Sequence, residues 1–171
     1  MLKKKEYERF RQIKARYLAK FSKAEGKKQL DKLKGDFLEY LVRLAFERLG
    51  YSIRKHPNTP LDFLAYNKKL ELSIEVTNWK DLSYPHPDYT SSKLEAFKLV
   101  KTTNLWIVSF LKVLEFTKEE VKELAKTHNL YFVELGRDLD FQNCSYDEYL
   151  DMKTRIKNKL KEKTRRQDKG I

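Results

Sequence analysis

The stretch LDFLAYNKKLELSIEVT, residues 61–77, decides the fold of this chain. Its second half alternates between apolar and polar side chains, which is the period of a β-strand with one buried face. The apolar positions are Leu70, Leu72, Ile74 and Val76. A second apolar run covers residues 61–66, and Asn67-Lys68-Lys69 separates the two. We therefore predict a β-hairpin.

Two acidic residues, Asp62 and Glu75, are the chemically distinctive part of this hairpin. If its loop holds an even number of residues, Tyr66 lies opposite Glu71, and Asp62 lies opposite Glu75 on the same face. The other face would then carry the core residues Leu61, Phe63, Leu72, Ile74 and Val76. Facing like charges destabilise a sheet, and Mg²⁺ between them would offset this. The pair is either a metal site or a turn acid after Pro60 and a solvated glutamate.

A helix expected before the hairpin supplies a third acid. Residues 36–49 present a wide apolar face, and Gly50 follows in the usual C-terminal position. Glu39 lies at the border of that face, from which it can lean toward the two hairpin acids. A short strand at residues 51–55 connects this helix to the hairpin.

The segments after the hairpin predict a mixed sheet. Capping-box patterns open helices at 92–101 and 117–128, and apolar strands follow at 105–110 and 131–135. Strand–helix–strand units require parallel pairing through right-handed crossovers, whereas the hairpin adds antiparallel pairing. We expect an α/β (α+β) fold with a mixed central sheet flanked by helices.

The excess positive charge of the chain is concentrated at its two ends. Residues 1–34 hold 13 Lys/Arg and 4 Asp/Glu, residues 151–171 hold 9 and 3, and residues 35–150 hold 15 and 18. Clustered positive charge is typical of polyanion binders, although Lys-rich helical faces can also be merely solvated. The candidate nucleic-acid-binding residues are Lys3, Lys4, Lys5, Arg11, Lys14, Lys34, Arg155, Lys159, Arg165 and Arg166.

The same ends predict two basic helices, at residues 2–23 and from residue 145 to about 166. Each carries a narrow apolar stripe, and the two stripes either pack on each other or meet a second subunit. One stripe is Tyr7, Phe10, Ile13, Tyr17 and Phe21, and the other is Tyr149, Met152, Ile156 and Leu160. We expect a single domain, 1–171, with a core at 35–144 between basic arms at 1–34 and 145–171.

Composition excludes several classes of protein. The chain has 171 residues and a net charge of +12, and it lacks the run of roughly 18 apolar residues that a membrane span needs. The start has no apolar stretch of the signal-peptide type. Cys144 is the only cysteine, which rules out an internal disulfide and a cysteine zinc site. We expect a cytoplasmic, reducing compartment and no membrane partner.

Four pieces of the sequence, taken in order, resemble the PD-(D/E)XK, or restriction-endonuclease-like, nuclease superfamily. They are Lys34-Gly35-Asp36-Phe37-Leu38-Glu39, Leu49-Gly50-Tyr51-Ser52-Ile53-Arg54, Pro60-Leu61-Asp62 and Ile74-Glu75-Val76-Thr77. The similarity is greatest to archaeal Holliday junction resolvases and related archaeal or viral nucleases, and it covers about residues 34–135. It implies an αβββαβ core, DNA as the partner and a homodimer, in the host cytoplasm if the protein is viral.

The resemblance also implies the chemistry of an Mg²⁺-dependent endonuclease, a hydrolase in which Mn²⁺ can substitute and which can be selective for branched or structured DNA. Asp62, Glu75 and the Val76 carbonyl would be metal ligands, and Glu39 would be the helix acid. The family's lysine position falls on Thr77, whose neutral hydroxyl cannot supply a positive charge. Lys93, or alternatively Lys80, would replace that lysine. The rival interpretation is a non-catalytic DNA- or RNA-binding protein on a nuclease-derived fold.

Overall fold

Two compact units make up the chain, one of helices and one built around a sheet. The computed structural model describes residues 2–55, 61–77, 98, 104–109, 122–123, 126–134 and 143–169. The helical unit comprises Met1–Leu49 and Leu139–Ile171, and the sheet unit comprises Gly50–Asp138. Helices and strands are therefore both present, as the α+β class requires, and the basic segments at the two ends of the sequence fall in the same unit.

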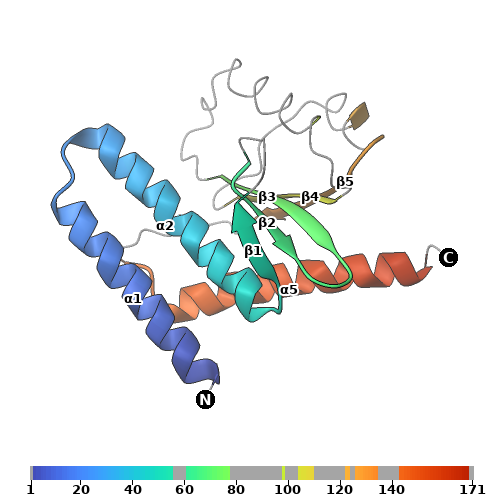
Figure 1. Ribbon diagram of the computed structural model, residues 1–171, viewed down its shortest axis with the longest axis horizontal. Coiled ribbons are helices and arrows are strands. Elements are labelled where there is room, and N and C mark those ends of the chain that lie inside the picture. The colour runs from blue at the N-terminus through green and yellow to red at the C-terminus, as the bar shows by residue number, and fades with distance from the viewer. Residues whose placement is uncertain are drawn as a thin grey trace. The chain divides into compact units, whose positions relative to one another are not determined.

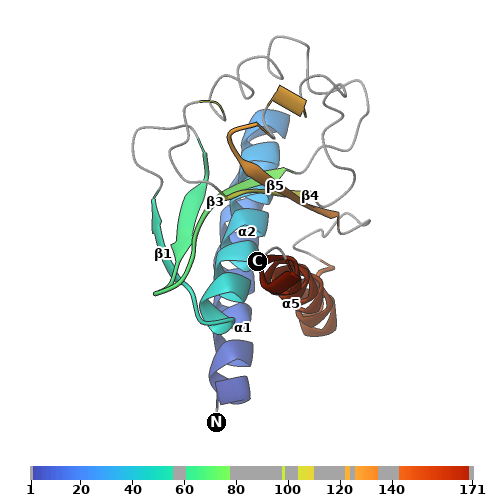
Figure 2. The same cartoon turned by 90° about the vertical axis from the view of Figure 1, so that its right-hand side faces the viewer.

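The sheet unit contains a five-stranded sheet with the strands in sequence order. Its strands are β1 (Ser52–Lys55), β2 (Phe63–Tyr66), β3 (Glu71–Thr77), β4 (Asn104–Ser109) and β5 (Asn129–Glu134). β1, β2 and β3 pair antiparallel, whereas β3, β4 and β5 pair parallel. The predicted mixed sheet is therefore confirmed. The strand direction turns between β1 and β5 (Figure 2), as the intrinsic twist of β-strands produces.

The β2–β3 hairpin has the predicted register. Tyr66 lies opposite Glu71, and the pairing continues to Phe63 opposite Ile74. Asn67 shapes the turn because its Oδ1 accepts hydrogen bonds from the backbone N–H groups of Lys69 and Leu70, each at 2.8 Å. The Asn67 N–H donates to the Leu70 carbonyl at 2.9 Å, which closes the hairpin. Local side-chain bonding of this kind is what favours Asn in turns.

β3 differs from its prediction in burial. The alternating pattern predicts one buried face, but Ser73 and Glu75 are buried as fully as Leu72 and Ile74 on the opposite face. β3 is the third of five strands and is therefore flanked on both sides. The polar residues of its second face lie inside the protein, where each polar atom needs a partner.

The helical unit consists of α1 (Leu2–Ser22), α2 (Gly26–Arg48) and α5 (Tyr146–Lys169). α1 and α2 lie side by side in opposite directions, and α5 runs across the pair (Figures 1 and 2). Gly26 has φ +83°, a value that favours glycine, and it follows the extended Glu25 at the start of α2. α2 thus begins ten residues before the predicted start at residue 36. Residues 26–35 are rich in helix formers but too poor in apolar residues to show a helical period.

The two terminal stripes pack against each other within the helical unit, as the first of the two expectations requires. Phe10, Ile13 and Tyr17 of α1 are buried, as are Tyr149, Met152 and Ile156 of α5. The rings of Phe10 and Tyr149 stack with their centroids 5.6 Å apart. Ser145 caps α5 as predicted, because its Oγ accepts a hydrogen bond from the Glu148 N–H at 3.1 Å. The helix extends to Lys169, beyond the expected end near residue 166.

The two helices expected between strands fall mostly outside the described residues. Lys98 is helical, as the prediction for 92–101 requires, and so are residues 122 and 123 of the predicted helix 117–128. That second helix does not reach His128 as expected, since residues 126–128 form a turn before β5. Within the described part of the chain, none of the helices combines the length and apolar character needed to cross a membrane.

Candidate functional site

Asp62 stands immediately before β2 and bonds to β3 through its side chain. The strand pairing ends at Phe63 opposite Ile74, and the Asp62 Oδ2 accepts a hydrogen bond from the Val76 N–H at 2.7 Å. This bond fixes one carboxylate oxygen of Asp62 beside the peptide group that joins Glu75 to Val76. The aspartate is therefore held against β3 by a specific hydrogen bond. The alternative of a turn acid after Pro60 does not account for this bond.

Glu75 occupies the strand position that continues the register from Ile74, opposite Asp62. It lies in the middle of the sheet, where β4 places Ile107 beside it, and only 3% of its surface is exposed. The alternative of a solvated strand glutamate is therefore wrong. Burial of a carboxylate is costly unless cations or hydrogen-bond donors compensate its charge. Two acids in neighbouring positions increase that cost, because like charges oppose each other.

The oxygen-bearing groups at these positions are of the types that suit a hard divalent cation. Carboxylates of Asp62 and Glu75 and the backbone carbonyl of Val76 are ligands of the type that Mg²⁺ and Mn²⁺ take, with water or phosphate oxygens completing the shell. Among the residues that the structure describes, no group of three or more His, Cys, Asp or Glu side chains is placed to hold a metal ion. Such an ion would therefore depend on substrate and solvent oxygens as well as on the two acids.

Glu39, the third predicted acid, has a partner in its own helix. Its Oε1 lies 3.0 Å from the Arg43 Nη2, one turn further along α2. The Arg43 guanidinium also lies over the ring of Tyr40, 5.4 Å from the centroid. α2 belongs to the helical unit, whereas Asp62 and Glu75 belong to the sheet unit. The role of Glu39 at a metal site stays a prediction.

The predicted lysine substitutes lie outside the described residues. Neither Lys80 nor Lys93 is among them, so both remain predictions. Thr77, which takes the position of the motif lysine, is the last residue of β3, and its backbone pairs with Ser109 of β4.

The predicted nucleic-acid-binding residues all lie on helices of the helical unit. Lys3, Lys4, Lys5 and Arg11 are exposed on α1. Three others contact groups of the protein: Lys14 Nζ donates to the Cys144 carbonyl at 2.8 Å, Arg155 pairs with Asp151 at 3.3 Å, and Lys159 pairs with Glu162 at 3.5 Å. The remaining positions are Lys34, half-buried on α2, and Arg165 and Arg166 in the last turns of α5.

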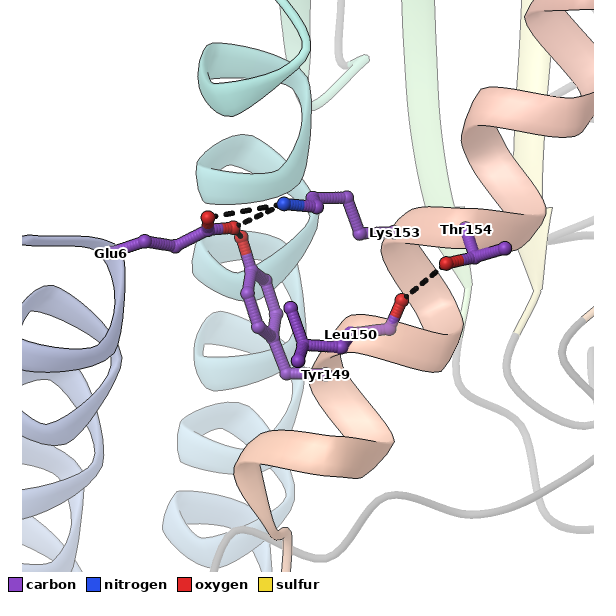
Figure 3. Close-up of polar contacts among 5 residues, drawn as sticks. All are labelled: Glu6, Tyr149, Leu150, Lys153 and Thr154. Atoms are coloured by element: carbon purple, nitrogen blue, oxygen red, sulfur yellow. Dashed lines mark hydrogen bonds and ion pairs between the residues drawn. The ribbon is translucent and has the colours of Figure 1, made fainter. Parts of the chain in front are cut away.

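A buried polar cluster between α1 and α5 was not predicted from the sequence (Figure 3). The Glu6 carboxylate accepts hydrogen bonds from the Tyr149 hydroxyl at 2.8 Å and from Lys153 Nζ at 2.7 and 3.0 Å. Burial raises the pKa of the Tyr149 phenol above its usual value of 10.0, and the adjacent Glu6 carboxylate raises it further. Glu6 precedes Phe10 by four residues and Ile13 by seven, so its spacing places it on the buried stripe and could have identified it.

Comparisons with protein-family models, with curated proteins and with solved structures find no match to this chain. Three features of the chain itself bear on its function. The Asp62 side chain is bonded to β3, Glu75 is buried on that strand, and basic residues are concentrated on α1 and α5.

Proposed function

We propose that this protein is a metal-dependent endonuclease that hydrolyses DNA phosphodiester bonds on a restriction-endonuclease-like αβββαβ core. One observation carries the proposal: the Asp62 carboxylate is bonded to the Val76 N–H, and the buried Glu75 occupies the opposing strand position. Two carboxylates on neighbouring segments, together with the Val76 carbonyl, would make a donor set that suits Mg²⁺ or Mn²⁺. The mixed sheet and the described helical residues are compatible with such a core.

Each residue has a defined role in this proposal. Asp62, Glu75 and the Val76 carbonyl would hold the cation, which when bound makes water more acidic and stabilises charge on phosphate oxygens. The Val76 N–H orients Asp62 through its 2.7 Å hydrogen bond to Oδ2. Lys93 or Lys80 supplies the positive charge that Thr77 lacks, and Glu39 is the helix acid of the motif. The site is selective for branched or other structured DNA, and the active assembly is a homodimer.

The basic residues of the helical unit bind phosphate groups in this proposal. Such contacts position the substrate without reading its sequence, and they release counterions, so the affinity falls steeply as salt increases. Lys3, Lys4 and Lys5 are exposed on the first turns of α1, where they are accessible to a backbone phosphate.

One sequence feature favours a second function. Thr77 at the motif lysine position suits a nucleic-acid-binding protein that has kept the fold and lost catalysis. In that case the basic helices would bind DNA or RNA, and the two acids would have a structural role.

Substitutions that keep side-chain shape provide the sharpest test. Asp62→Asn retains an oxygen that can accept the Val76 N–H, and Glu75→Gln retains the volume of a buried side chain, while each removes one negative charge. Glu71→Gln is the matched control, because Glu71 lies on the same strand but is exposed and paired with Arg54 at 3.1 Å. Linear duplex, single-stranded and four-way-junction DNA are incubated with Mg²⁺, with Mn²⁺ or with a chelator.

We expect chelator-sensitive cleavage in the native protein and in Glu71→Gln. Cleavage by Asp62→Asn and Glu75→Gln should fall by more than about 100-fold, since even changes in residues that only hydrogen-bond to a metal ligand typically cost about 10- to 100-fold. Circular dichroism establishes that each variant is folded. Tight, salt-sensitive binding without any cleavage would select the non-catalytic alternative. Cleavage that persists in both folded variants would refute the assignment of the acids.

A further inference from the structure

A groove of about 360 Å³ lies along α1 in the helical unit. Tyr7, Arg11, Lys14 and Leu18 line it from α1, and residues 144–146 form its other wall. The four α1 residues are spaced by three or four positions and therefore share one face of the helix. This face borders the buried stripe of Phe10, Ile13 and Tyr17, and Phe10 also lines the groove. The volume is within the range of about 300–1,000 Å³ found for small-ligand sites.

The apolar part of the groove is exposed to solvent. Tyr7 retains 42% of its surface and Leu18 retains 37%, which makes them two of the three exposed large apolar residues among those described. The Tyr7 ring contacts the Tyr146 ring edge-on, with centroids 5.0 Å apart and planes at 77°. Tyr146 in turn contacts Phe10 and Tyr149. Tyr7 is thus the exposed end of a buried aromatic cluster, which holds its ring in place.

Cationic groups accompany this aromatic surface. The Arg11 guanidinium lies 5.8 Å from the centroid of the Tyr7 ring. The Lys14 ammonium is held at the groove wall by its 2.8 Å bond to the Cys144 carbonyl, and this neutral partner does not cancel its charge. Lys4 is exposed about one helical turn before Tyr7. An occupant of this groove therefore meets apolar and aromatic surface at the centre and positive charge along it.

We propose that this groove binds an unpaired nucleotide, with the base packed against Tyr7 and Leu18 and the adjoining phosphates bound by Arg11 and Lys4. Single-stranded nucleic acid combines planar apolar bases with a regular negative charge, and proteins bind it through aromatic platforms in positively charged grooves. The groove offers the Tyr7 ring to a base and the charges of Arg11 and Lys4 to the phosphates. A second copy of this chain would bring another strongly basic surface against it, which is unfavourable. The inference rests on the proposed function and refines its substrate to nucleic acid with unpaired bases.

Binding is measured by fluorescence anisotropy with the full chain in EDTA, so that cleavage does not contribute. The probes are a labelled oligothymidine of about 12 nucleotides, within the site sizes known for single strands, and a blunt duplex. Tyr7→Ala should weaken oligothymidine binding by about 5- to 150-fold, the range expected for loss of one stacked base. Tyr7→Phe should bind like the native protein, and Tyr7→Leu, which keeps apolar packing with Tyr146, should behave like Tyr7→Ala. Binding of the duplex should change less than about twofold in all three.

Arg11→Ala and Arg9→Ala form a matched pair of controls. Both remove one exposed positive charge from α1, but Arg9 lies on the opposite side of the helix from Arg11. Arg11→Ala should weaken oligothymidine binding several-fold more than Arg9→Ala. Equal losses would mean that only the overall charge matters, and they would refute the groove as a specific site.

Three other outcomes would also overturn the inference. Tyr7→Ala could weaken duplex and single strand equally, which would indicate backbone contacts alone. Sedimentation could show a dimer that Tyr7→Ala dissociates, which would identify the groove as a subunit interface. Polyglutamate could displace the oligothymidine as effectively as unlabelled oligothymidine does, which would indicate an acidic protein partner. Because the assay contains no metal ion, loss of nuclease activity in the Asp62 and Glu75 variants leaves this test unaffected.

Discussion

Substitution of Lys153 tests the buried contact between α1 and α5. Lys153 Nζ lies 2.7 and 3.0 Å from the two carboxylate oxygens of Glu6, whose side chain is only 7% exposed, while that of Lys153 is 22% exposed. Lys153→Met keeps most of the aliphatic packing but removes the ammonium group. It leaves the Glu6 charge with the Tyr149 hydroxyl as the remaining donor of this cluster.

The expected cost is about 3 kcal/mol in the free energy of unfolding. Removing one partner of a buried ion pair typically costs about 3–5 kcal/mol, and the lower end applies because Lys153 retains contact with water. Urea unfolding followed by circular dichroism measures this change. Lys157→Met is the control, because Lys157 is exposed one turn further along α5 and its loss should cost less than about 0.5 kcal/mol.

A double-mutant cycle measures the coupling between Glu6 and Lys153. Glu6→Gln removes the buried negative charge, so Lys153→Met should cost much less in that background, with a coupling of about 1–3 kcal/mol. Two results would show that the cluster does not stabilise the association of α1 with α5. Lys153→Met in the native background could cost as little as Lys157→Met, or the costs of Glu6→Gln and Lys153→Met could be simply additive.

Three further predictions concern the helical unit and the metal site. The pKa of Tyr149 is raised by folding, so the folded state keeps a proton that the unfolded state loses near pH 10. The free energy of unfolding is therefore unaffected by this group below about pH 10 and decreases as the pH rises further. Urea unfolding at alkaline pH should show a smaller decrease for Tyr149→Phe than for the native protein. Ser145→Ala should cost about 1 kcal/mol in urea unfolding through loss of the α5 cap, whereas Ser145→Asp should cost little. If Asp62 and Glu75 hold a divalent cation, Mg²⁺ or Mn²⁺ should raise the melting temperature of the native protein but not that of Glu75→Gln.

Much of the sheet could be predicted because local patterns encode it. The alternation along residues 70–77 identifies β3, and Asn67 marks the turn. The register that places Asp62 opposite Glu75 was expected only if the loop holds an even number of residues, and the pairing of Tyr66 with Glu71 meets that condition. Apolar runs likewise predict the parallel strands β4 and β5. The capping pattern at Ser145 identifies the start of α5. In each case a few neighbouring residues carry the physical cause, namely side-chain alternation, turn hydrogen bonding or the capping of free N–H groups.

Other features depended on contacts between segments far apart in the sequence. Glu75 has the pattern of a solvated strand residue, yet only 3% of its surface is exposed, because groups outside its own strand cover that face of the sheet. Glu6 looks like one charge among many on a basic helix, yet Tyr149 and Lys153, more than 140 residues away, enclose it. Local patterns in the sequence identified most of the helices and strands and the residues that could bind a metal or a phosphate. Which charges are buried became known only from the fold, because burial depends on the segments that surround a residue and not on its neighbours in the chain.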